Sequence, residues 1–61
     1  MTEFTTADQA RLAQDDHEMA VIIRQQPPAG APEWERFRAL RQEAMALRQK
    51  QQQVLAEIAR T

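Results

Sequence analysis

The sequence predicts an all-α fold, an antiparallel helical hairpin that dimerises into a four-helix bundle. All three prolines and the only glycine of the 61 residues lie between positions 27 and 32. On both sides of this segment, apolar residues recur at intervals of three and four, which is the period of an α-helix. The pattern predicts a single domain over residues 1–61, with a short tail at 1–5, helices at about 6–25 and about 32–60, and a Pro/Gly turn at 26–31.

The first helix is predicted to begin at one of two threonines. Thr5 or Thr6 supplies a hydroxyl that can accept a hydrogen bond from a free N–H at the helix start, and Thr6 with Gln9 has the spacing of a capping box. Further along, an apolar stripe at helical spacing contains Leu12, Met19, Ala20 and Ile23. The stripe predicts a helix with one apolar face.

The Pro/Gly segment is predicted to end the first helix and to start the second. Pro27 and Pro28 lack the N–H that a helix needs, and each disfavours helical conformation in the residue before it. Gly30 permits a positive φ, and Pro32 suits the first position of a helix, where a missing N–H costs nothing. A connection of about six residues typically makes two helices antiparallel neighbours.

The second helix carries apolar residues at the 3-4 spacing of a coiled coil. We call this set the heptad seam: Phe37, Leu40, Ala44, Leu47, Gln51, Val54 and Ile58. Gln51 is its one polar member, and it either fixes the register or marks the point where the seam becomes accessible to solvent. A second line of residues follows the neighbouring flank of the helix: Trp34, Arg38, Arg41, Met45 and Arg48.

The two helices are expected to face each other where residue numbers add up to about 57. In this register Asp16 approaches Arg41 and Asp8 approaches Arg48, so acids of the first helix lie against bases of the second. The predicted hairpin interface consists of Leu12, Met19, Ile23, Trp34 and Met45. This packing leaves the heptad seam partly uncovered. Because exposed apolar stripes usually mark interfaces, the seam is predicted to bury itself in a homodimer.

The composition argues against several classes of protein. The chain has no Cys and one His, so neither a disulfide nor a zinc site of the usual His/Cys kind is expected. No catalytic motif or Gly-rich phosphate loop occurs, and we expect no enzymatic activity, no cofactor and no metal. The N-terminus does not resemble a secretion signal and no apolar run is long enough to span a bilayer, so a cytoplasmic protein without membrane contact is expected.

The remaining hypothesis is a small module that binds and modulates a larger host protein, as an inhibitor or a chaperone. Ala-rich, Arg-rich and Lys-poor composition is typical of GC-rich bacterial or phage genomes. Under the expected register, the end of the second helix runs past the start of the first and leaves an apolar overhang. The candidate partner-binding residues are Val54, Leu55, Ile58, Val21, Arg36 and Arg38.

An RNA- or DNA-binding regulator of the same fold is the main alternative. Its binding face would consist of Trp34 with Arg36, Arg38, Arg41 and Arg48, in which Arg contacts phosphate and Trp stacks on a base. Three acids lie among these residues, Glu33, Glu35 and Glu43. A phosphate-binding face would normally exclude carboxylates, so we rank nucleic acid below a protein partner.

In layout, the predicted dimer of hairpins resembles Rop, the RNA-binding regulator of plasmid copy number. The resemblance implies a four-helix bundle. The Rop family binds RNA through basic and aromatic residues of its first helix, whereas the first helix here is acidic and Phe4 lies outside its stripe. The layout also resembles the hairpin chaperones of secretion systems, which implies a third arrangement in which a different chain fills the seam of a heterodimer.

Overall fold

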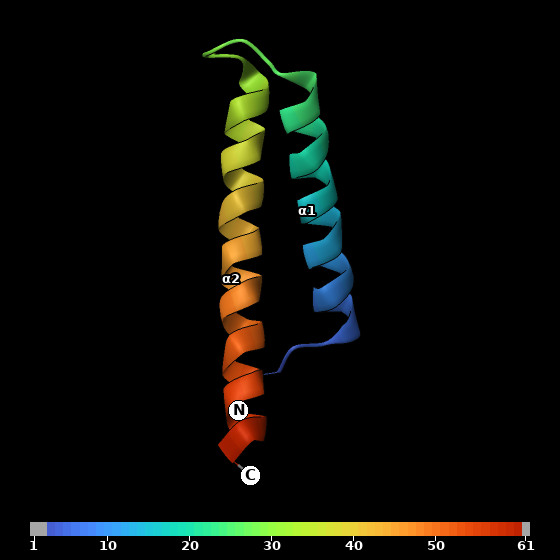
Figure 1. The fold of residues 1–61 in the computed structure, drawn as a ribbon, viewed down its shortest axis with the longest axis vertical. Coiled ribbons are helices and arrows are strands. Elements are labelled where there is room, and N and C mark those ends of the chain that lie inside the picture. Colours follow the sequence, from blue (N-terminus) through green and yellow to red (C-terminus); the bar gives the residue numbers. More distant parts are fainter. Residues whose placement is uncertain (1–2, 61) are drawn as a thin grey trace.

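The computed structural model describes residues 3–60 as two long helices that pack side by side in opposite directions (Figure 1). Helix α1 spans Thr6–Gln25 and helix α2 spans Pro32–Arg60. The molecule measures 48 × 17 × 14 Å. The predicted all-α hairpin is confirmed, and both helices have the bounds that the sequence predicts.

Thr5 caps the start of α1. Its side-chain hydroxyl accepts a hydrogen bond from the backbone N–H of Asp8, and the Asp8 carboxylate accepts one from the backbone N–H of Thr5, both at 3.1 Å. This is a capping box, but it is shifted by one residue from the predicted pair of Thr6 and Gln9. In the observed box the backbone N–H of Thr5 donates to the carboxylate of Asp8, and this negative charge also interacts favourably with the positive end of the helix dipole.

Replacing Thr5 with alanine is expected to lower the free energy of unfolding by about 0.5–2 kcal/mol, because the N–H of Asp8 loses its acceptor. Thr6→Ala is the matched control. Thr6 lies one residue inside the helix and makes no capping bond, so its replacement should change stability by less than about 0.5 kcal/mol. Thermal or urea unfolding followed by circular dichroism measures both. Equal losses would contradict the assignment of Thr5 as the cap.

The turn between the helices is closed by backbone geometry and by one tryptophan. Gln26 has a left-handed conformation with φ of 49° and ends α1, while Gly30 has φ of 82°, as the sequence predicts. The indole N–H of Trp34 donates to the carbonyl oxygens of Pro27 and Pro28, each at 3.2 Å. The Trp34 ring also meets Phe37 edge to face, at 5.6 Å between ring centres. The indole therefore holds the turn against the first part of α2.

The core is a narrow line of side chains between the two helices. Leu12 and Ile22 of α1 are buried, as are Leu40 and Ala44 of α2. The last two belong to the heptad seam, so the seam faces α1. Phe37, Leu47, Gln51 and Val54 of the same seam are partly buried.

The prediction that the Met45 flank packs against α1 is wrong. Met45 follows the fully buried Ala44 and lies about 100° further around the helix, where its side chain is 55% exposed. Ile23 is also exposed, while Met19 and Trp34 are partly buried and Leu12 lies in the core as predicted. Turning the seam toward α1 buries Leu40 beside the small Ala44. Turning the Met45 flank inward would have brought arginines toward the core instead.

Four ion pairs link the helices, and in each an acid of one helix lies against a base of the other. Their partners are Arg11 with Glu43, Glu18 with Arg36 (2.9 Å), Asp16 with Arg48 (2.6 Å) and Asp8 with Lys50 (2.8 Å). The expected complementarity is present with other partners, since Asp16 meets Arg48 rather than Arg41 and Asp8 meets Lys50 rather than Arg48. Exposed ion pairs each contribute only about 0–1 kcal/mol to the free energy of unfolding. They therefore select the register of the two helices more than they stabilise the hairpin.

Candidate functional site

The end of α2 extends beyond the start of α1 (Figure 1). The last inter-helix pair joins Asp8, near the start of α1, to Lys50, and α2 continues for ten further residues to Arg60. We call Val54–Ile58 the α2 extension. Within it Leu55 is 53% exposed, Ile58 is more exposed still, and Val54 is partly buried. The structure thus places two large apolar side chains at the surface of one end of the hairpin.

The other predicted partner-binding residues lie at the opposite end. Val21 and Arg36 come together in a hollow of about 300 Å³ near the turn, which Glu18, Ile22, Gln25 and Glu33 also line. Arg36 is held there by its ion pair with Glu18. The six predicted residues therefore do not form one surface: Val21, Arg36 and Arg38 lie toward the turn, and the other three lie on the α2 extension.

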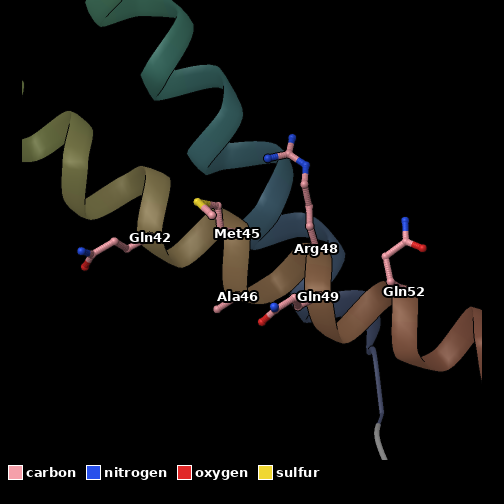
Figure 2. Close-up of a pocket in the computed structure, with 6 residues that line it drawn as sticks. All are labelled: Gln42, Met45, Ala46, Arg48, Gln49 and Gln52. Carbon is pink, nitrogen blue, oxygen red and sulfur yellow. The ribbon is translucent and has the colours of Figure 1, made fainter.

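A second hollow lies along α2 itself. It has a volume of about 490 Å³ and is lined by Gln42, Met45, Ala46, Arg48, Gln49 and Gln52 (Figure 2). We call it the α2 groove. Figure 2 shows the Arg48 side chain directed toward α1, where it pairs with Asp16. The remaining lining is uncharged, and Met45 is its largest apolar side chain. Sequence reasoning missed this groove because it assigned Met45 to the hairpin interface.

The arginines proposed for nucleic acid are divided between two roles. Arg36 and Arg48 are engaged in ion pairs with α1, whereas Arg38 and Arg41 are exposed and line a hollow of about 390 Å³ with Gln42 and Met45. Trp34 donates its N–H to the turn and packs against Phe37. Two arginines outside these pairs and a tryptophan fixed to the turn make a poor surface for binding phosphates and bases.

A buried carboxyl group lies in the middle of the hairpin. Asp15 is 0% exposed, and neither of its side-chain oxygens accepts a hydrogen bond from a donor within residues 3–60. The nearest charge of opposite sign is Arg11, with its Nε 3.5 Å from Oδ1. The Arg11 guanidinium is mainly engaged with Glu43, which both its Nε and its Nη2 contact.

Burial raises the pKa of Asp15, and the adjacent carboxyl of Glu43 raises it further through a hydrogen bond and through repulsion. Such a bond between two carboxyl groups requires that one of them holds a proton. The pKa of Glu43 is lowered, first by the hydrogen bond from Arg11 and then by the one from Asp15. Burial and the neighbouring Glu43 carboxyl therefore both favour the protonated form of Asp15.

Asp8 has the opposite electrostatic environment. Hydrogen bonds from Lys50 and from the backbone N–H of Thr5 lower the pKa of Asp8, because both favour the ionised carboxylate. The same side chain therefore caps α1 and ties its start to α2. As the pH falls through the lowered pKa, both contacts weaken and the stability that they contribute is lost.

The described residues contain no group of three or more His, Asp or Glu side chains that could hold a metal ion. His17, the only histidine, is exposed on α1. Within residues 3–60, neither helix has a stretch long and apolar enough to cross a membrane. No protein-family profile matches the sequence, and comparisons with curated proteins and with solved structures found no significant match.

Dimerisation stays a prediction, but the structure changes the surface that it would use. The heptad seam was predicted to meet a second copy because the hairpin left it uncovered. In the structure Leu40 and Ala44, at the middle of the seam, are covered by α1. The large apolar side chains that stay exposed within residues 3–60 are Ile23, Met45, Leu55 and Ile58. A dimer of intact hairpins must therefore use a surface other than the middle of the seam.

Proposed function

We propose that this protein is a small interaction module that binds a larger protein through the α2 extension and modulates it as an inhibitor or a chaperone. The observation that carries the proposal is the exposure of Leu55 and Ile58, which lie beyond the start of α1. Apolar side chains spaced three apart on an exposed helix are the usual anchors by which a helix binds a groove in its partner. The proposed setting is the cytoplasm of a bacterium or of a phage-infected cell.

Charge distribution supports a protein partner over nucleic acid. The net charge of the chain is −1, and four of its eight basic residues pair with acids of the other helix. The α2 extension contributes one charged residue, Glu57, which is an acid. The affinity of the α2 extension for its partner would therefore come from apolar contact and would change little with salt concentration.

Photocrosslinking from the α2 extension tests this function. A photoreactive amino acid at position 55 is expected to crosslink to one predominant protein in a lysate of the native host, and the crosslink should persist after nuclease treatment. Position 56 is the matched control, because the next residue points about 100° away around the helix. With the photoreactive amino acid at position 54 instead, the native side chains at 55 and 58 should still support crosslinking. The double substitution Leu55→Ser/Ile58→Ser is expected to abolish it, while circular dichroism shows the same helix content.

Two outcomes would contradict the proposal. Equal crosslinking from positions 55 and 56 would mean that the contact does not distinguish the apolar face of the α2 extension from the rest of the helix. Loss of the crosslink on nuclease treatment would assign the binding to nucleic acid. A steep fall of affinity with salt would accompany that second outcome, because each neutralised phosphate releases counterions.

A further inference from the structure

The side of α2 that faces away from α1 carries an uncharged stripe. Its residues recur at the 3-4 spacing of a coiled-coil seam and are Ala39, Gln42, Ala46, Gln49, Gln53 and Ala56, all of them exposed. They lie on the opposite side of the helix from the buried Leu40 and Ala44. Charged residues make up 28% of the chain, yet none occupies this stripe between positions 39 and 56. We call it the outer stripe.

The α2 groove lies at the middle of the outer stripe. Gln42, Ala46 and Gln49 belong to both, and Met45 and Gln52 border the stripe along one flank (Figure 2). The Met45 side chain is 55% exposed, although a thioether gains from burial. The groove thus offers space beside an apolar side chain that the hairpin leaves uncovered.

Charges along the other flank of the outer stripe alternate in sign. They occur at intervals of seven residues, in the order Arg36, Glu43, Lys50 and Glu57. A two-fold rotation reverses this order, so a second copy lying antiparallel would place the partner's Glu57 opposite Arg36 and the partner's Lys50 opposite Glu43. Each base then faces an acid on both halves of the interface.

The ends of the outer stripe follow the same rule. Continuing the 3-4 spacing in both directions leads to Glu35 and to Arg60. An antiparallel partner would set the partner's Arg60 against Glu35, whereas a parallel partner would set Glu35 and Arg60 each against its own copy. Both ends therefore favour the antiparallel orientation.

We propose that a second copy of this chain docks antiparallel along the outer stripe, with the two-fold axis passing beside the peptide bond between Leu47 and Arg48. Ala39 then faces the partner's Ala56, and Ala46 faces the partner's Gln49. Alanine at these layers allows the two helix axes to approach closely. Met45 of each copy enters the α2 groove of the other, beside the partner's Gln52.

The charges identify a second copy as the occupant. Their order along α2 is complementary in sign to the same order read in the opposite direction. Three of the four alternating charges are already oriented by α1, through the pairs Arg36–Glu18, Glu43–Arg11 and Lys50–Asp8. The partner's charges would extend these pairs into a network across the interface. This proposal shares Ala56 and Glu57 with the α2 extension but does not use Leu55 or Ile58, and no residue of the extension lines the α2 groove.

Engineered disulfides test the orientation directly, because the native chain has no cysteine. The double variant Ala39→Cys/Ala56→Cys is expected to form a covalent dimer under mild oxidation. Each single variant should stay uncrosslinked, because positions 39 and 56 lie about 25 Å apart along the helix and a lone cysteine would be that far from its copy. A dimer from either single variant would establish a parallel pairing and overturn the proposal.

Sedimentation equilibrium of the cysteine-free protein measures the strength of the association. Ala46→Glu introduces a charge beside the two-fold axis and is expected to raise the dimer dissociation constant at least tenfold, about 1.4 kcal/mol. Ala13→Glu on the exposed face of α1 is the matched control and should leave the constant unchanged. A wild-type protein that sediments as a monomer at all accessible concentrations would overturn the proposal, as would equal effects of the two substitutions. Crosslinking from position 55 to a larger protein is unaffected by either result, so the two proposals can fail separately.

Discussion

Replacing Leu40 with alanine is expected to remove most of the stability of the hairpin. Leu40 is 2% exposed and is the largest apolar side chain that the two helices bury completely. Truncating such a leucine costs about 2–5 kcal/mol through lost burial and the cavity left behind. A domain of this size rarely has more than about 3–5 kcal/mol in total. The variant should therefore be largely unfolded under conditions in which the wild type is folded.

Leu55→Ala makes the same chemical change at a position that is 53% exposed, and it is the matched control. It is expected to change the free energy of unfolding by about 0.5 kcal/mol or less. Urea unfolding at one fixed protein concentration compares the two, since any dimerisation makes the midpoint depend on concentration. Similar losses in the two variants would mean that the seam does not pack against α1 as the structure shows.

The helix bounds could be predicted from the sequence because the signals that set them are local. Pro27, Pro28 and Gly30 act on the backbone of their immediate neighbours, and Pro32 has a preferred place at a helix start whatever packs around it. The cap was left open between Thr5 and Thr6, since both offer a hydroxyl, and the capping box was placed one residue too late, at Thr6 with Gln9. The choice was decided by Asp8, whose short carboxylate reaches back to the N–H of Thr5.

The face that α2 turns toward α1 could not be predicted in the same way. Both the heptad seam and the Met45 flank have helical periodicity, and periodicity alone does not say which stripe meets the first helix. Packing decided it, because the seam brings Leu40 and Ala44 together between the helices. The error had a consequence for the site, since it hid the exposure of Met45 and the groove beside it.

The burial of Asp15 was not predicted because apolar residues alone defined the predicted core stripe of the first helix. The side of α1 that faces α2 runs through Leu12, Asp15, Met19 and Ile22, which is an unbroken 3-4 pattern. Asp15 stands three residues after Leu12 and four before Met19, so spacing alone places it in the core. A polar residue inside such a pattern was the available signal.

Replacing Asp15 with asparagine is expected to stabilise the hairpin at neutral and mildly alkaline pH. Burial and the Glu43 carboxyl raise the pKa of Asp15, so the folded state binds its proton more tightly than the unfolded chain does. The stability contributed by this group is fully present below the unfolded pKa of about 3.9 and is lost as the pH rises through the raised pKa. Above that pH the wild type buries a carboxylate without a hydrogen-bond donor, which asparagine avoids.

The expected gain for Asp15→Asn at about pH 8 is on the order of 1–3 kcal/mol, the usual penalty for an unsatisfied buried polar group. It should shrink steadily as the pH falls through the raised pKa and level off below the unfolded pKa of about 3.9, where Asp15 becomes protonated in both states. The pKa of Asp8 is lowered rather than raised, but Asp8 is unchanged in the variant and its contribution cancels, so the difference between the two stability curves reports the interacting pair of Asp15 and Glu43. Urea unfolding at a series of pH values measures this difference.

Asp16→Asn is the matched control, because Asp16 is the next residue and makes an exposed ion pair with Arg48. Losing that pair is expected to cost about 0–1 kcal/mol near neutral pH and to give no gain. If Asp15→Asn instead destabilised the protein at about pH 8, the charge on Asp15 would have to be compensated by Arg11, whose Nε lies 3.5 Å away. The sign of this one difference therefore decides whether Arg11 neutralises the buried Asp15 or mainly serves Glu43, as the contacts of its guanidinium indicate.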